Sequence, residues 1–356
     1  MVVGIVYSVP LPRISGLLQS TKIENGKSYW NLPEYGEPLW LQGGAEALAY
    51  ICNFYLKRQP KLTLLLPDYF CGQSLRYLRS MNVDLDFYPL TQTLTPDLGY
   101  LKQYQKKVDL FLLVHYFGKI VDRTNIIRFC HENNATLIED CAHVLSPVVD
   151  RGWLGEYLIF SPRKQMAVKN GGVLYSRNEK FSGVHPKKSQ WTWYLKQYLK
   201  FVAYTLLQPR FSTDSKIVWS GKSQAIQFNS PSKLDFRFLI SAERYFDHEQ
   251  LGRIRNYDYL VSILMRYENW CPLFSNKANS TAFFYLAMKC NTKRVASNYY
   301  SKLRYCGCPV LMWPDLPIEI RDKEAPEERV ERIIFFSLLS QNDMAKYIKL
   351  VCRALS

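Results

Sequence analysis

The chain has 356 residues, of which 47% are hydrophobic and 15% are aromatic. This length and composition exclude a disordered chain and predict about two domains with a large buried core. The net charge of +15 favours anionic partners through its field alone, although an ordinary basic enzyme would also carry such a charge.

The cysteines and the apolar segments predict a protein of a reducing compartment. Nine cysteines occur without a C-x-x-C pair, and Cys306 and Cys308 have no second ligand pair at zinc spacing, so we expect no metal site. The short apolar start, residues 1–6, lacks the features of a signal peptide. No apolar run approaches the roughly 20 residues that cross a bilayer. We therefore expect a cytoplasmic protein.

Helices and strands alternate over the first half of the chain. After an extended lead-in over 1–40, helices are expected over 45–56, 74–81, 100–107 and 122–133. Strands are expected over 62–66, 83–88, 108–114, 135–138 and 173–176. Because these strands are apolar and alternate with helices, they predict a mainly parallel sheet in an α/β layer.

The second half has a different character. Residues 178–232 are rich in Lys, Trp and Tyr, and the spacing of the apolar residues predicts a helix over 191–207. Further elements are expected as a long helix over 241–267, strands near 282–290 and 332–338, and a closing helix over 342–355. These patterns predict a large domain over 1–230, which carries the 178–232 insertion, and a small C-terminal α/β domain over 231–356.

Two stretches carry residues suited to chemistry. Leu137 to His143 places Asp140 at the carboxyl end of a buried strand, where open α/β sheets bind ligands. Phe160 to Lys164 follows, and then Asn170-Gly171-Gly172. A lysine amine can form a Schiff base with the aldehyde of pyridoxal phosphate (PLP), and a carboxylate can keep the pyridine nitrogen of that cofactor protonated. Taken alone, Asp140 could be a strand-end cap and Lys164 a surface charge.

Five segments resemble, in the same order, the motifs of the DegT/DnrJ/StrS family of PLP-dependent sugar aminotransferases. These segments are Gly43 to Leu48, Pro67 to Phe70, Val114 to Gly118, Ile138 to His143, and Lys164-Gln165 through Asn170-Gly171-Gly172. The resemblance implies a fold-type-I, three-layer α/β domain with a mainly parallel sheet, followed by a smaller C-terminal α/β domain. It also implies PLP as the cofactor.

The resemblance implies a role for each matching cofactor residue. Lys164 would hold PLP covalently, and Asp140 would pair with its pyridine nitrogen. His143 stands where the family has a Gln that contacts the ring hydroxyl, and an imidazole N–H could do the same, although a hydrogen-bonded core residue is an equal alternative. The remaining cofactor residues are expected to be Gly44 and Ala45 at the phosphate, Phe70 or Tyr69 over one ring face, and Ser161.

Two residues are candidates for substrate binding, and each has a structural alternative. Arg237 would bind a substrate anion or pair with Asp235. His115 would contact the substrate or be a hydrogen-bonded core residue.

Three residues depart from the family pattern. Ala45 replaces a phosphate-binding Thr, Asp235 replaces an Asn that reaches the phosphate from the neighbouring subunit, and Asn170 replaces an acidic residue. A basic side chain such as Arg163 or Lys169 could compensate. These departures motivate the alternative of a degenerate, non-catalytic binding protein.

The sequence therefore predicts a PLP-dependent aminotransferase that moves an amino group from glutamate to an anionic, nucleotide-linked keto sugar, in surface-polysaccharide or secondary-metabolite synthesis. The resemblance implies a homodimer with the active site at the subunit interface. The divergent second half leaves a non-sugar acceptor open, whereas the retained Lys164 argues against the dehydratases of the family, which typically carry His there. No recognition motif supports nucleic-acid binding. The helix over 191–207 would touch the inner membrane face or pack on protein.

Overall fold

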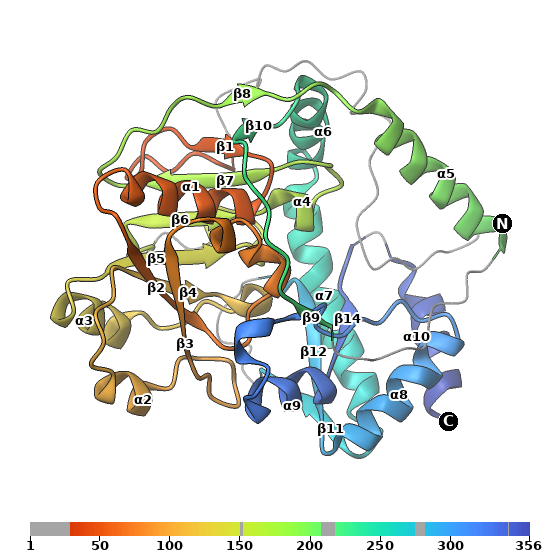
Figure 1. Cartoon of the computed structure of the whole chain (residues 1–356). Coiled ribbons are helices and arrows are strands. Elements are labelled where there is room, and N and C mark those ends of the chain that lie inside the picture. The colour runs from red at the N-terminus through yellow and green to blue at the C-terminus, as the bar shows by residue number, and fades with distance from the viewer. Residues whose placement is uncertain (1–28, 150–151, 208–217, 275–281, 341) are drawn as a thin grey trace.

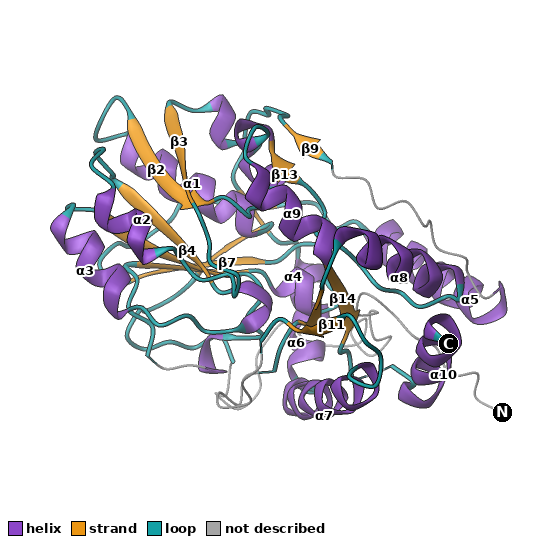
Figure 2. Ribbon diagram, turned by 90° about the horizontal axis from the view of Figure 1, so that it is seen from below, coloured by secondary structure: helices purple, strands orange, loops and turns teal. Residues whose placement is uncertain are grey.

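The computed structural model describes residues 29–149, 152–207, 218–274, 282–340 and 342–356. In this part of the chain, a seven-stranded sheet lies within the first half of the sequence and a three-stranded sheet within the second (Figure 1). Helices accompany both sheets (Figure 2). The predicted α/β class is confirmed.

The large sheet is mainly parallel, as predicted. Its strand order is β1-β7-β6-β5-β4-β2-β3, and β2 to β6 run parallel while β7 is antiparallel to both of its neighbours. The strands are β1 Leu39–Leu41, β2 Leu62–Pro67, β3 Val83–Tyr88, β4 Leu110–Val114, β5 Thr136–Cys141, β6 Tyr157–Phe160 and β7 Gly172–Ser176. Every residue of β4 is buried, which is why its sequence is continuously apolar rather than alternating.

Helices and short turns join these strands. The helices are α1 Gly44–Leu56, α2 Leu98–Gln103, α3 Thr124–Glu132 and α4 Pro162–Gln165. The 3-10 turns are η2 Gly72–Leu75, η3 Leu78–Ser80, η4 Tyr116–Gly118 and η5 Pro147–Val149. Helix α1 packs against β6 and β7, and α3 packs against β5.

The continuous helix expected over 74–81 is wrong, because η2 and η3 occupy this stretch. Contacts with the C-terminal part hold the segment in place. Asp315 accepts a hydrogen bond from the backbone of Gln73, and Arg79 pairs with Glu319. A side chain on Gly72 would lie 2.5 Å from the carbonyl oxygen of Leu316, so the two backbones meet directly. Tertiary contacts therefore override the local helix pattern.

The C-terminal part contains a small antiparallel sheet of order β11-β12-β14. Its strands are β11 Trp270–Pro272, β12 Tyr285–Cys290 and β14 Ile333–Ser337. Helices α8 Lys293–Tyr305 and α9 Glu324–Arg332, which the sequence did not predict, accompany it together with η6 Ile318–Ile320 and the expected closing helix α10 Met344–Leu355. The domain boundary near 230 stays a prediction.

Two helices replace the single long helix predicted over 241–267. They are α6 Lys233–Glu243 and α7 Phe246–Leu264, and Tyr245 between them has non-helical backbone angles. Helix α6 starts earlier than expected because Ser232 and Asp235 form a capping box. Two short pairs complete the structure, β8 His185–Pro186 with β10 Asn229–Ser230, and β9 Trp219–Ser220 with β13 Leu316–Pro317.

Helix α5 Trp191–Leu207 has the predicted bounds and lies at the periphery of the molecule (Figures 1 and 2). Trp191, Leu195 and Leu199 are exposed on it, whereas Tyr194 is buried. No helix among the described residues combines the length and the apolar character needed to span a bilayer. Contact of α5 with a membrane surface stays a prediction.

Candidate active site

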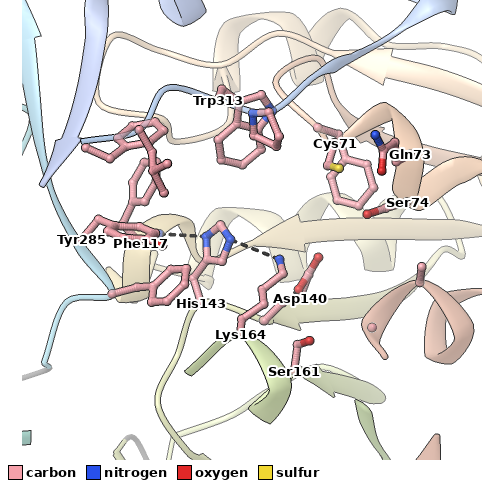
Figure 3. Close-up of a pocket in the computed structure, with 18 of the residues that line it drawn as sticks. Cys71, Gln73, Ser74, Phe117, Asp140, His143, Ser161, Lys164, Tyr285 and Trp313 are labelled. Carbon is pink, nitrogen blue, oxygen red and sulfur yellow. Dashed lines mark hydrogen bonds between the residues drawn. The ribbon is translucent and has the colours of Figure 1, made fainter. Parts of the chain in front are cut away.

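A cavity of about 640 Å³ is lined by both parts of the chain (Figure 3). Its lining includes polar and ionisable side chains, namely Cys71, Gln73, Ser74, Arg76, Asp140, His143, Ser161, Arg163 and Lys164. The aromatic lining residues are Phe70, Phe117, Phe284, Tyr285, Tyr300, Trp313 and Phe335. The cavity therefore combines ionisable groups from the large sheet with an aromatic wall.

Lys164 lies on the short helix α4, which begins with Pro162 at its first position. Its Nζ atom lies 3.2 Å from Nε2 of His143. Burial lowers the pKa of Lys164, and this effect outweighs the opposing charge of Asp140 and the further opposing influence of Cys71, while the nearby charge of Arg163 lowers the pKa further. A lowered pKa increases the fraction of free amine, which is the nucleophilic form.

Asp140 lies near the carboxyl end of β5, with its side chain in the cavity. Its Oδ1 atom accepts a hydrogen bond of 2.8 Å from the backbone N–H of Ala142. Burial raises the pKa of this carboxyl group, against the lowering influence of Lys164. A cation placed beside Asp140, such as a protonated pyridine nitrogen, would therefore be stabilised as an ion pair.

His143 follows β5 and joins Lys164 to the backbone of a neighbouring turn (Figure 3). Its Nδ1 atom accepts a hydrogen bond of 3.2 Å from the backbone N–H of Phe117. The rings of His143 and Phe117 stack with centroids 5.6 Å apart and an interplanar angle of 16°. Burial, assisted by the charge of Lys164, lowers the pKa of His143 well below its usual range, so the ring is neutral at pH 7.

The N-terminus of α1 forms another wall of the cavity. Gly43 is its N-cap and supplies no side-chain acceptor, so the first amides of the helix remain available to an anion. Ser161 is buried, and its Oγ atom has no hydrogen-bond partner among the described residues. The Nε atom of Arg163 lies 2.8 Å from the position that a Cβ on Gly43 would take. Backbone amides, a hydroxyl and a guanidinium are groups that bind anions, so they form a candidate site for a phosphate.

Close packing of backbone supports this wall. A Cβ on Gly172 would lie 2.4 Å from the carbonyl carbon of Gly43, so only glycine allows β7 to approach the start of α1 this closely. Glu46, in the first turn of α1, is paired with Arg76 at 3.0 Å and accepts a hydrogen bond from Tyr77. This pairing offsets the negative charge that Glu46 brings to the phosphate site.

Seven of the residues predicted for the site line the cavity, namely Gly44, Ala45, Phe70, Asp140, His143, Ser161 and Lys164. Tyr69, His115 and Arg237 are not among its lining residues. Tyr69 is buried and stacks on Trp313 with ring centroids 4.4 Å apart, which leaves Phe70 as the candidate to cover a ring. Arg237 is exposed on α6.

His115 lies in the core next to the site. Its Nε2 atom is 2.8 Å from Oε2 of Glu139, and both side chains are fully buried. Its Nδ1 atom accepts a hydrogen bond from the backbone N–H of Val121. The structure therefore gives His115 the geometry of the hydrogen-bonded core residue rather than a place in the cavity.

Two departures from the family pattern contact each other. Asp235 accepts a hydrogen bond from the amide of Asn170 at 3.2 Å and another from the hydroxyl of Tyr194 at 2.7 Å. Its carboxylate also caps α6 through Ser232. The negative charge of Asp235 is thus enclosed by hydrogen-bond donors within its own chain.

Sequence reasoning missed the residues that connect the site to the C-terminal part. Asp315 is buried and accepts hydrogen bonds from the thiol of Cys71 at 2.9 Å and the backbone of Gln73 at 2.8 Å. Arg329 pairs with the buried Asp68 at 3.0 Å. Because it follows the motif Pro67 to Phe70, the segment with Cys71 and Gln73 could have been suspected of belonging to the site. No local pattern marks Asp315 or Arg329.

The helix that carries Lys164 is also held from behind. Arg253 of α7 is fully buried and forms an ion pair of 2.7 Å with Glu249. Its guanidinium also donates to the side chain of Gln165 and, at 3.3 Å, to the carbonyl oxygen of the same residue. The residue next to Lys164 is therefore fixed by the second half of the chain.

Several solved structures share this architecture. The chain is similar to Helicobacter pylori PseC, an aminotransferase involved in the biosynthesis of pseudoaminic acid, with a TM-score of 0.72 and 12% identity, covering 99% of each chain. It is also similar to NtdA from Bacillus subtilis with bound cofactor PMP (TM-score 0.64, 14% identity, 89% of this chain and 73% of that chain). A third similar structure is the GDP-4-keto-6-deoxymannose-3-dehydratase ColD (TM-score 0.63, 13% identity, 91% and 89%).

At these identities the likeness establishes the fold, which is that of the fold-type-I PLP enzymes. The sequence carries a match to a family as well. Residues 83–184, which include Asp140, His143 and Lys164, match the DegT/DnrJ/EryC1/StrS aminotransferase family. Over this segment the chain is similar to that family, and its fold is that of PLP-dependent aminotransferases.

Proposed function

We propose that this protein moves an amino group from an amino acid, with glutamate as the expected donor, to an anionic, nucleotide-linked keto sugar. The family match over residues 83–184 and the fold support a PLP-dependent aminotransferase, so the donor and the acceptor are what is proposed. The observation that carries the proposal is the cavity in which Lys164, Asp140 and an unfilled anion site face one another.

The residues present fit PLP. Lys164 would hold the cofactor covalently, and Asp140 would pair with its ring nitrogen. The amides at the start of α1, the orphaned hydroxyl of Ser161 and the guanidinium of Arg163 would hold its phosphate. When bound, the cofactor supplies an aldehyde for attachment and a ring that withdraws electrons from the substrate.

The protein's own groups then perform three tasks. Asp140 keeps a cation in place at the ring nitrogen, because its buried carboxylate is stabilised by a neighbouring positive charge. Lys164, once released, can take and return a proton as a free amine, and its lowered pKa increases the fraction in that form. The aromatic wall of Phe117, Phe284 and Trp313 excludes water from the reacting atoms.

The charge distribution supports an anionic acceptor. Arg163 and Arg76 both line the cavity, and the whole chain carries a net charge of +15. Such a field attracts phosphate-bearing ligands. Phe284, Tyr285 and Trp313 offer flat apolar faces, and this observation favours the second candidate, an acceptor that is not a sugar.

The test is the absorbance spectrum of the purified full-length protein with PLP, before and after glutamate, beside the Lys164→Ala variant. We expect a protein-bound band that changes on glutamate and that the variant lacks. Lys196→Ala is the matched control, because Lys196 is an exposed lysine outside the cavity. A wild-type protein that stays colourless would refute the proposal in favour of a non-catalytic binding protein.

A separate measurement tests assembly. We propose a homodimer whose subunits complete the active site together, as the resemblance implies. Analytical ultracentrifugation should give twice the 41.7 kDa mass of the chain. A monomeric species that retains full activity would contradict an interface site.

A further inference from the structure

Four nitrogen atoms of three residues in the cavity form a continuous hydrogen-bonded chain (Figure 3). The backbone N–H of Phe117 donates to Nδ1 of His143 over 3.2 Å, and Nε2 of the same ring lies 3.2 Å from Nζ of Lys164. A backbone amide can only donate, so its partner Nδ1 carries no proton. This first link fixes the tautomer of the ring.

The tautomer in turn fixes the second link. A neutral imidazole holds one proton, and with Nδ1 occupied as an acceptor that proton sits on Nε2. Nε2–H then donates toward Nζ of Lys164. Only an unprotonated amine has a lone pair to accept this bond, because an ammonium group is a donor alone.

We propose that His143 is a positioning residue for Lys164, whose Nε2–H donates to Nζ and holds the lysine as a free amine directed into the cavity. The inference rests on the proposed function only for its purpose, which is to keep Lys164 ready to react with an aldehyde. The hydrogen-bond chain itself belongs to this protein's own residues.

The surroundings of the ring support a neutral His143. Phe117, Phe284 and Trp313 surround it with ring centroids 5.6, 5.2 and 6.0 Å away. Burial is the larger cause that lowers the pKa of His143, and Lys164 would lower it further whenever it is protonated. A cationic ring would lose solvation without gaining a carboxylate partner, so the neutral form prevails.

The groups around Lys164 have opposing effects on its protonation. Asp140 on β5 and Cys71 before η2 favour the ammonium form, whereas burial and Arg163 on α4 favour the free amine. The Nε2–H of His143 donates to the free amine and therefore favours that form. The hydrogen bond from the imidazole thus acts in the same direction as burial and against Asp140.

The amide that anchors this chain is held in a restricted conformation. Phe117 has φ 56° and ψ 15°, a left-handed geometry that is uncommon for a bulky residue, and Gly118 follows with φ 91°. The carbonyl oxygen of Phe117 accepts the backbone N–H of Phe284 over 2.7 Å. This hydrogen bond to the residue that precedes strand β12 thus helps to fix the turn whose N–H, that of Phe117, donates to His143.

The experiment is competitive labelling of the full-length protein, freed of cofactor, with a trace of acetic anhydride across a series of pH values. Peptide mass spectrometry gives the labelling of Lys164 relative to the exposed Lys196. His143→Asn keeps an acceptor for Phe117 and loses the atom that reaches Lys164. His143→Gln places an amide N–H near the position of Nε2. Thermal unfolding shows that each variant is folded.

We expect His143→Asn to raise the apparent pKa of Lys164 by about one unit, the size of one hydrogen bond, and His143→Gln to restore most of that shift. An unchanged profile in the Asn variant, or equal shifts in both variants, overturns the proposal. Nitrogen NMR of the wild-type chain needs no substitution. It should find the Nε2–H tautomer of His143, and an Nδ1–H tautomer overturns the proposal as well.

These outcomes are separable from the proposed function. A protein that never binds PLP but shows the labelling shift would retain the inference about His143 and lose the aminotransferase proposal. A protein with a normal cofactor spectrum and no labelling shift would do the reverse.

Discussion

Replacing Arg253 tests how the second half of the chain supports the helix of Lys164. Arg253→Met keeps the bulk of the side chain but removes the ion pair with Glu249 and both contacts with Gln165. Removing one partner of a buried pair costs about 3–5 kcal/mol, because the other charge is left unpaired. The side chain of Glu249 is 20% exposed and keeps its hydrogen bonds from Ser340, so we expect the lower end, about 3 kcal/mol.

Urea unfolding followed by tryptophan fluorescence measures this loss, since the chain has eight tryptophans. The double variant Arg253→Met/Glu249→Gln removes the orphaned charge, and we expect it to recover about 1–2 kcal/mol. The affinity for PLP should fall in the single variant, because Gln165 adjoins Lys164. A stability loss below about 1 kcal/mol, or a double variant that shows simple additivity, would refute the reasoning.

Three further substitutions have defined outcomes. Asp140→Asn keeps the bond from Ala142 but loses the charge, so we expect bound PLP with a glutamate half-reaction slowed at least about a hundredfold in stopped-flow absorbance; an unaffected rate would contradict the role of the carboxylate. Ser161→Ala should lower the affinity for PLP about tenfold in titrations, while the affinity for unphosphorylated pyridoxal should not change. Equal losses of affinity for both ligands would show that Ser161 does not contact the phosphate. Glu243 is buried, and burial raises its pKa to about 7 from 4.5, so its contribution to stability is present below pH 4.5 and is lost as the pH rises through 7. Glu243→Gln should abolish this loss of up to about 3 kcal/mol in urea unfolding, and parallel pH profiles of the two proteins would contradict it.

Local patterns predicted the elements whose own residues decide their structure. The strand over 83–88 and the helix over 191–207 have the observed bounds, because the spacing of their apolar residues is typical of a strand and of a helix, respectively. Strand β6, Tyr157–Phe160, escaped prediction because its four apolar residues are too short a run to separate from a loop. Helix α8 was missed because its buried face consists of only Ala296, Tyr300 and Leu303 among polar residues.

The same distinction applies to the site. Lys164, Asp140 and His143 were located because each belongs to a short motif at a strand end or turn, and all three line the cavity. Trp313 and Asp315 were not located, because they meet Tyr69 and Cys71 only after the chain has folded back over more than half of its length. A contact of that sequence separation leaves no periodicity and no spacing to detect.

The cavity's shared construction has a consequence for engineering. The groups that anchor the cofactor come from residues before 165, whereas Phe284, Tyr285 and Trp313 come from a segment beyond 280. A chimera that receives this later segment from a relative could accept a different substrate while keeping its own anchoring groups. Asp315 and Arg329 would have to be retained in the chimera. Their contacts with Cys71 and Asp68 join the transplanted segment to the part of the chain that anchors the cofactor.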